Sequence, residues 1–128
     1  MDQTRKEIER LLEKYGADQF ASGWTASEAV LAFRMEGRHI KFNLPLPDGK
    51  REGADNAAKE ARRRWRALLL VVKAKLEAVA TGVSVFDDEF MAHIVMPDGS
   101  TIGEAMRPQI RQMYLDGKMP PLLAFRPS

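Results

Sequence analysis

The chain has no cysteine. This absence excludes disulfide bonds, thiol catalysis and cysteine-based metal sites, and it is consistent with a reducing compartment. The first residues, MDQTRKEIER, lack the apolar core that a signal peptide requires. The longest apolar run, Ala67 to Val72, is far too short to span a bilayer. We therefore expect a cytoplasmic protein that has no membrane partner.

Recognisable catalytic motifs are also missing. The sequence contains no G-x-S-x-G nucleophile elbow, no H-E-x-x-H zinc site and no phosphate-binding P-loop. Asp87, Asp88 and Glu89 precede His93, but consecutive helical residues point about 100° apart, so this triplet does not converge on one metal ion. Two distant side chains that act as acid and base leave no local signature, and that alternative stays open. We assign no catalytic residue, metal site or cofactor, and we expect a protein that is not an enzyme.

Between Phe20 and Leu46, apolar and polar side chains alternate with a period of two residues. Residues 31–35 have an apolar side chain at every second position, and so do residues 40–44. Between these runs lies Glu36-Gly37, a plausible tight turn. This pattern predicts an antiparallel hairpin with one buried face. Phe20 to Trp24 can add a third strand at its edge.

The stretch Lys59 to Ala80, KEARRRWRALLLVVKAKLEAVA, has the period of a helix instead. At 100° per residue, six of its apolar side chains fall within an arc of roughly 100°. This arc predicts the core face of a long helix that ends near Gly82. The six residues are Trp65, Leu68, Leu69, Val72, Leu76 and Val79.

Three shorter helices are predicted from patterns that resemble capping boxes. Thr4, Ser84 and Thr101 each precede an acidic residue by three positions, so hydroxyl and carboxylate can satisfy the first backbone amides of a helix. The helix after Ser84 has a predicted core stripe at Phe86, Phe90 and Ile94. The helix after Thr101 is expected to end at Gly117. Its predicted core-facing side chains are Met106, Ile110, Met113 and Tyr114.

These patterns predict an α+β fold. It consists of an antiparallel β-hairpin or three-stranded sheet packed against one long basic helix and two or three shorter helices. A chain of 128 residues forms a single domain, 1–128. The segment PLPDGKREGADN is rich in turn residues and predicts a flexible loop at about 46–56. A proline-rich tail at about 118–128 is expected to pack back on the domain or to serve as a docking segment.

Positive charge is concentrated on the long helix. Residues 59–75 hold seven Lys/Arg and one Glu, so this window carries +6; because the whole chain carries +2, the remainder carries −4. Five of these bases share a second arc beside the apolar one. We call them the basic ridge: Lys59, Arg62, Arg63, Arg66 and Lys73. A charged run of this kind is usually a solvated helix face, and that alternative remains beside a binding role.

The polar face of the predicted hairpin adds Arg34, Arg38 and Lys41, with His39 among them. If the long helix and the hairpin lie side by side, these residues and the basic ridge form one continuous basic surface. Trp24 is a candidate platform on which a nucleic-acid base can stack.

Basic ridges serve two classes of partner. Contacts from lysine and arginine to phosphates give salt-dependent affinity without sequence specificity, as in nucleic-acid binding. The same charges can instead meet the surface of an acidic host protein. Homo-oligomerisation also stays open, because the apolar arc of the long helix can pack on a second copy as readily as on a sheet.

Several stretches together resemble a group of small proteins of no assigned activity that are encoded by bacteriophages and prophages. These stretches are RKEIERLLEKYGADQFASGW, AFRMEGRHIKFNLPLPD, RRRWRALLLVVKAKLEAV, HIVMPDGSTIGEAMRPQI and GKMPPLL, and they cover most of the chain. The resemblance implies action inside a bacterial host cell during phage growth, and it carries over no functional residue. We therefore expect a nucleic-acid-binding accessory protein of phage DNA metabolism. The alternative is a phage-encoded protein-binding module that inhibits or redirects a host protein.

Overall fold

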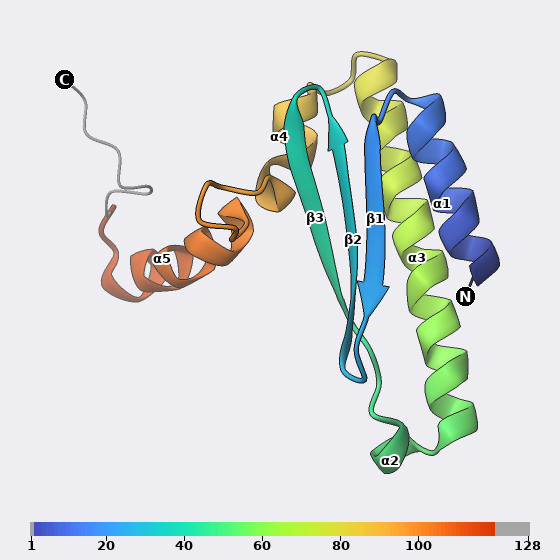
Figure 1. Ribbon diagram of the computed structural model, residues 1–128. Coiled ribbons are helices and arrows are strands. Elements are labelled where there is room, and N and C mark those ends of the chain that lie inside the picture. Colours follow the sequence, from blue (N-terminus) through green and yellow to red (C-terminus); the bar gives the residue numbers. More distant parts are fainter. Residues whose placement is uncertain (1, 120–128) are drawn as a thin grey trace.

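The computed structural model describes residues 2–119 and confirms the α+β fold (Figure 1). The elements are α1 (Asp2–Lys14), β1 (Gln19–Trp24), β2 (Glu28–Met35), β3 (Arg38–Pro45), α2 (Gly49–Glu52), α3 (Ala54–Ala80), α4 (Phe86–Phe90), the 3-10 helix η1 (Met91–His93) and α5 (Ile102–Asp116). Apart from its first two residues, the proline-rich tail lies outside the described residues.

The sheet has three antiparallel strands in the order β1-β2-β3, so the third strand expected at Phe20 to Trp24 is present. Phe20 lies opposite Phe33, which in turn lies opposite Ile40, and these residues share one face. At the β2–β3 turn, Glu36 and Gly37 have φ values of 55° and 73°. Two consecutive positive φ values are typical of the type I′ turn, whose twist matches that of a hairpin.

Helices α1 and α3 lie side by side along one side of the sheet and run in the same direction (Figure 1). The core lies between them and the sheet. It contains the predicted arc of α3 from Trp65 to Leu76, and α1 adds Ile8 and Leu12. Phe90 of α4 is fully buried against Phe33 and Phe42, with ring centroids 6.0 and 6.4 Å away. The predicted core position of Phe90 is therefore confirmed.

The three predicted capping boxes have different outcomes. Thr101 caps α5 as expected: its hydroxyl accepts from the Glu104 N–H, and the Glu104 carboxylate accepts from the Thr101 N–H. Thr4 lies inside α1, which begins at Asp2. The cap of α4 is Val85, without a side-chain bond, and the Ser84 hydroxyl instead donates to the Val85 carbonyl. Both of these predictions were wrong because a hydroxyl three residues before an acid is a frequent chance pattern.

The segment predicted as a loop at 46–56 is partly helical. Asp48 accepts a hydrogen bond from the Lys50 N–H and caps the short helix α2. Gly53, with φ of 85°, separates α2 from the start of α3 at Ala54. Helix α3 therefore begins five residues before Lys59, which is the first residue of the stretch predicted to be helical.

Helix α5 does not pack its apolar face into the core, and this part of the prediction was wrong. Tyr114 is 82% exposed and Ile110 is 42% exposed, and none of the residues of α5 is buried. The physical reason is the direction in which the chain leaves the sheet. Ile94 pairs with Ile40 on β3, after which α5 leads away from the sheet (Figure 1). The face of the sheet that needs covering is already occupied by the other helices.

Candidate nucleic-acid interface

The basic ridge of α3 lies on the exposed surface of that helix, beside its buried arc. Within residues 2–119, three of its members have no acidic partner: Lys59, Arg62 and Lys73. Arg63 pairs with Glu60 on the same helix, at 3.3 Å. Arg66 pairs across to Glu7 of α1, also at 3.3 Å. Solvent-exposed pairs of this kind contribute only about 0–1 kcal/mol, so an incoming phosphate can replace the glutamate.

A groove of about 400 Å³ separates α1 from α3, and we call it the interhelical groove. Its walls are Glu7, Arg10, Leu11 and Lys14 from α1 and Arg66, Leu69, Leu70 and Lys73 from α3. Four bases thus border one groove together with a single acid. Charges of one sign along a concave surface raise the local concentration of an oppositely charged ligand.

Arg10 and Lys14 were missed by the sequence reasoning. Acidic residues are interspersed with the bases of α1, so its overall charge does not stand out. The signal was the spacing: Lys6, Arg10 and Lys14 recur every four residues and therefore share one helix face. Only the packing of α1 beside α3 shows that this face meets the basic ridge.

The hairpin bases do not join the basic ridge. Arg34 follows the buried Phe33, and Lys41 follows the buried Ile40. Because side chains alternate along a strand, Arg34 and Lys41 point to the face opposite the one that α3 covers. The continuous basic surface considered from the sequence is therefore absent among residues 2–119.

Arg38 is held by an acid from another element. Its guanidinium donates to both carboxylate oxygens of Asp87, at 2.8 and 2.7 Å, and it also donates to the Glu36 carbonyl. The hydrogen bonds with Asp87 raise the pKa of Arg38, and they lower the pKa of Asp87. This bidentate pair ties the β2–β3 turn to α4, so Arg38 has a structural partner already.

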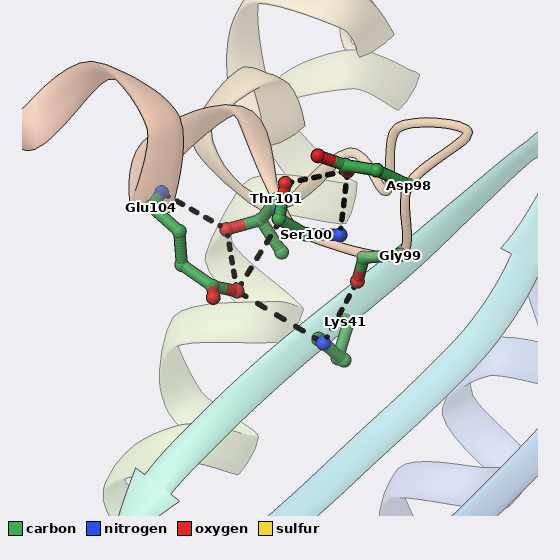
Figure 2. Close-up of polar contacts among 6 residues, drawn as sticks. All are labelled: Lys41, Asp98, Gly99, Ser100, Thr101 and Glu104. Carbon is green, nitrogen blue, oxygen red and sulfur yellow. Dashed lines mark hydrogen bonds and ion pairs between the residues drawn. The ribbon is translucent and has the colours of Figure 1, made fainter.

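Lys41 has a similar role at the base of α5. Its ammonium donates to the Gly99 carbonyl at 3.2 Å and lies 3.9 Å from the Glu104 carboxylate (Figure 2). The same Glu104 carboxylate accepts from the Thr101 N–H and hydroxyl, and these hydrogen bonds lower its pKa. Lys41 therefore links β3 to the turn before α5.

The two tryptophans lie in different environments. Trp65 is 2% exposed and belongs to the core, as its position on the apolar arc predicts. Trp24, at the end of β1, is 60% exposed and so has the accessibility that a stacking platform needs. Two members of the acidic triplet are engaged elsewhere, since Asp87 pairs with Arg38 and Glu89 with Lys75. Within the part of the chain that the structure describes, no three His, Asp or Glu side chains are grouped to hold a metal ion.

No protein-family model, curated protein or solved structure matches this chain. The helices of residues 2–119 include none with the length and hydropathy that crossing a membrane requires. The assignment of the interface therefore depends on its own chemistry.

The chemistry of this interface is that its cations lie in rows and can bind a series of anionic groups. The basic ridge extends over fifteen residues of α3, from Lys59 to Lys73, and the fourteen steps between them span about 21 Å at 1.5 Å per residue. Arg10 and Lys14 add a second row across the interhelical groove. Guanidinium groups suit the bidentate recognition of phosphates, and lysines act there as point charges. Two rows of cations along a groove match a polyanion better than a single small anion.

Proposed function

We propose that this protein is a non-enzymatic, nucleic-acid-binding accessory protein of phage DNA metabolism that acts in the cytoplasm of a bacterial host. The observation that carries the proposal is the convergence of Arg10 and Lys14 with Arg66 and Lys73 on one groove. The other members of the basic ridge extend this row of charge along α3. Phosphates are the sequence-independent feature of every nucleic acid, and cations arranged in rows bind them.

Affinity in this proposal depends steeply on salt. If six of these side chains contact phosphates, the slope of log affinity against log salt concentration is about −5 on duplex DNA. The experiment is a fluorescence-anisotropy titration of labelled single- and double-stranded DNA at several NaCl concentrations. Absence of binding to either form near physiological salt would refute the proposal.

A groove variant sharpens the test. Replacing Arg10, Lys14 and Lys73 together by glutamine should reduce the magnitude of the salt slope by about two to three. A matched control replaces Lys50, Arg51 and Lys118, which are exposed outside this groove, and so makes the same change in net charge. An equal effect of both triple variants would show that only the overall charge matters and would remove the groove from the proposal.

A second candidate is a module that binds an acidic host protein, and one observation favours it. Leu70, which is 60% exposed, lies in the wall of the interhelical groove among the bases. Apolar side chains at the centre of a contact are typical of protein interfaces. Leu70→Gln should leave affinity for nucleic acid within about twofold, whereas a loss of about tenfold or more is expected for a protein that buries this leucine. Pull-downs from bacterial lysate with the wild-type chain and with the Leu70→Gln variant compare how much partner protein each form retains.

A further inference from the structure

The interhelical groove combines cations with apolar side chains. Helices α1 and α3 run in the same direction, and Glu7 contacts Arg66 (Figure 1). Both helices rise by about 1.5 Å per residue, so Lys14 and Lys73, each seven residues further on, lie level with each other about 10.5 Å along the groove. Between these two levels the walls contain Arg10, Leu11, Leu69 and Leu70. The groove therefore offers apolar surface to a ligand that its cations hold.

A duplex can use only the cations of this groove. The faces of paired bases are stacked inside the double helix, so a protein contacts phosphates, sugars and the edges of bases. Packed helices have axes about 8–10 Å apart, which is less than the width of the DNA major groove alone, about 12 Å. A duplex therefore rests on the rims of the interhelical groove and leaves the leucines of its walls in contact with water.

A single strand can use both the cations and the apolar walls. It is thin enough to enter the groove, and its unpaired bases have free faces. Proteins that bind single strands typically have a positively charged groove that follows the backbone, with side chains on which the bases lie. The leucines lack the rings that give the strongest stacking, but covering them with a base still removes apolar surface from water.

We propose that the nucleic acid bound by this protein is single-stranded, with phosphates on Arg10, Lys14 and Lys73 and a base against the leucines of the interhelical groove. This inference rests on the proposed function and names the form of nucleic acid that the site takes.

The strand continues from the groove along the basic ridge. Arg62 and Lys59 lie four and seven residues before Arg66, near and beyond the level at which α1 begins, so α3 alone carries the strand there. The whole path from Lys59 to Lys73 is about 21 Å long. We therefore expect a site of roughly four nucleotides, at the low end of the range for single-strand-binding domains.

Electrostatics alone predict the opposite preference. Each phosphate contact contributes about −0.9 to the salt slope on duplex DNA and about −0.7 on a single strand, so the release of counterions favours the duplex at moderate salt. A row of cations on a plain helix surface should accordingly bind the duplex more tightly. A preference for single strands therefore reports the contacts that only unpaired bases make inside the groove.

The test is fluorescence anisotropy with three labelled probes in about 0.1 M NaCl. The probes are a thymidine strand, the same strand paired with its adenine complement, and an abasic strand with the same number of phosphates. The thymidine strand should bind at least about tenfold more tightly than the duplex and about threefold more tightly than the abasic strand. Leu70→Gln should cost less than the abasic probe does, because glutamine keeps an aliphatic stem and the other two leucines remain.

Two matched double variants locate the preference. Lys14→Gln with Lys73→Gln removes two charges from the interhelical groove, and Lys59→Gln with Arg62→Gln removes two from the basic ridge outside it. All four side chains are exposed, so both variants should fold. The groove variant should lower the ratio of single-strand to duplex affinity below about threefold, whereas the ridge variant should weaken both affinities and keep the ratio within about twofold of the wild-type value.

Three results would overturn the inference and leave the proposed function in place. They are a duplex that binds as tightly as the single strand or more tightly, a ratio that falls equally in both double variants, and an abasic strand that binds as tightly as the thymidine strand. Absence of binding to all three probes would instead refute the proposed function itself, so the two failures are distinguishable.

Discussion

The guanidinium of Arg66 on α3 lies 3.3 Å from both carboxylate oxygens of Glu7 on α1. This contact joins the two helices that border the interhelical groove. It also places the one acid of that groove against one of its four bases. The pair is exposed to solvent, so its contribution to folding is small, about 0–1 kcal/mol. Its effect on ligand binding is larger, because Glu7 competes with a phosphate for Arg66.

Glu7→Gln should therefore tighten nucleic-acid binding. The substitution releases Arg66 and removes a negative charge from the groove, and we expect affinity to rise roughly threefold with a salt slope steeper by up to about one. Anisotropy titrations at two salt concentrations measure both effects. Glu13→Gln is the control, because Glu13 is exposed on α1 but is not part of the groove walls. Equal gains in both variants would indicate a general charge effect and no competition at Arg66.

The hairpin bases should contribute little to binding. Arg34 lies on the opposite face of the sheet from α3, and Arg38 is engaged by Asp87. Arg34→Gln combined with Arg38→Gln should lower affinity for duplex DNA less than twofold. Arg62→Gln combined with Lys73→Gln makes the same charge change on the basic ridge and should lower affinity roughly tenfold near 0.1 M salt. A larger loss of affinity in the Arg34/Arg38 double variant than in the Arg62/Lys73 double variant would place the interface on the sheet.

The difference between these two sets of bases shows what the sequence could and could not predict. Local chemistry was readable: the Thr101 capping box, the hairpin turn at Glu36-Gly37 and the buried arc around Trp65 all depend on residues close in the chain. The sequence could not predict which surface of one element contacts which surface of another. The meeting of Arg10 with Arg66 depends on how two helices dock, and a helical period alone contains no information about docking.

The apolar stripe of helix α5 shows the same limit of prediction from sequence. A stripe such as Ile110 and Tyr114 predicts that something covers it, but the stripe does not name what covers it. The core interpretation was reasonable because most such stripes pack on their own domain. It was wrong because the inner face of the sheet was already covered by α1 and α3.

Gly103 should be sensitive to the smallest substitution. A β-carbon at this position would lie 2.8 Å from the Ala92 carbonyl oxygen and 3.3 Å from the Ala92 β-carbon. Because backbone must move to relieve the contact, Gly103→Ala should lower the free energy of unfolding by about 1–3 kcal/mol in urea titrations. Gly23→Ala is the control, since among residues 2–119 a β-carbon there would have no atom within 4 Å apart from its chain neighbours. The control should leave stability unchanged or slightly raised, and equal losses would refute the packing argument.

His93 makes stability depend on pH. Its ring stacks on Phe42, with centroids 3.9 Å apart, and is half-buried. Burial lowers the pKa of His93, and the positive charges of Lys75 and Arg107 lower it further, while a hydrogen bond to the Lys41 backbone opposes the shift. The unfolded chain, with an ordinary histidine pKa of about 6.5, therefore binds a proton more readily than the folded chain. Stability from this group is fully present above about pH 6.5 and is lost as pH falls from there toward the lower pKa of the folded state.

His93→Gln should accordingly flatten the pH dependence of unfolding between about pH 5 and 7. Urea titrations at several pH values measure the slope. His39→Gln, at an exposed position of β3, is the control, because it also removes a histidine side chain. Asp87, Asp98 and Glu104 also have lowered pKa values, each from hydrogen bonds to its carboxylate, but their stabilisation is lost below about pH 5, outside the window. A His93→Gln slope equal to that of the wild type would mean that another group titrates there.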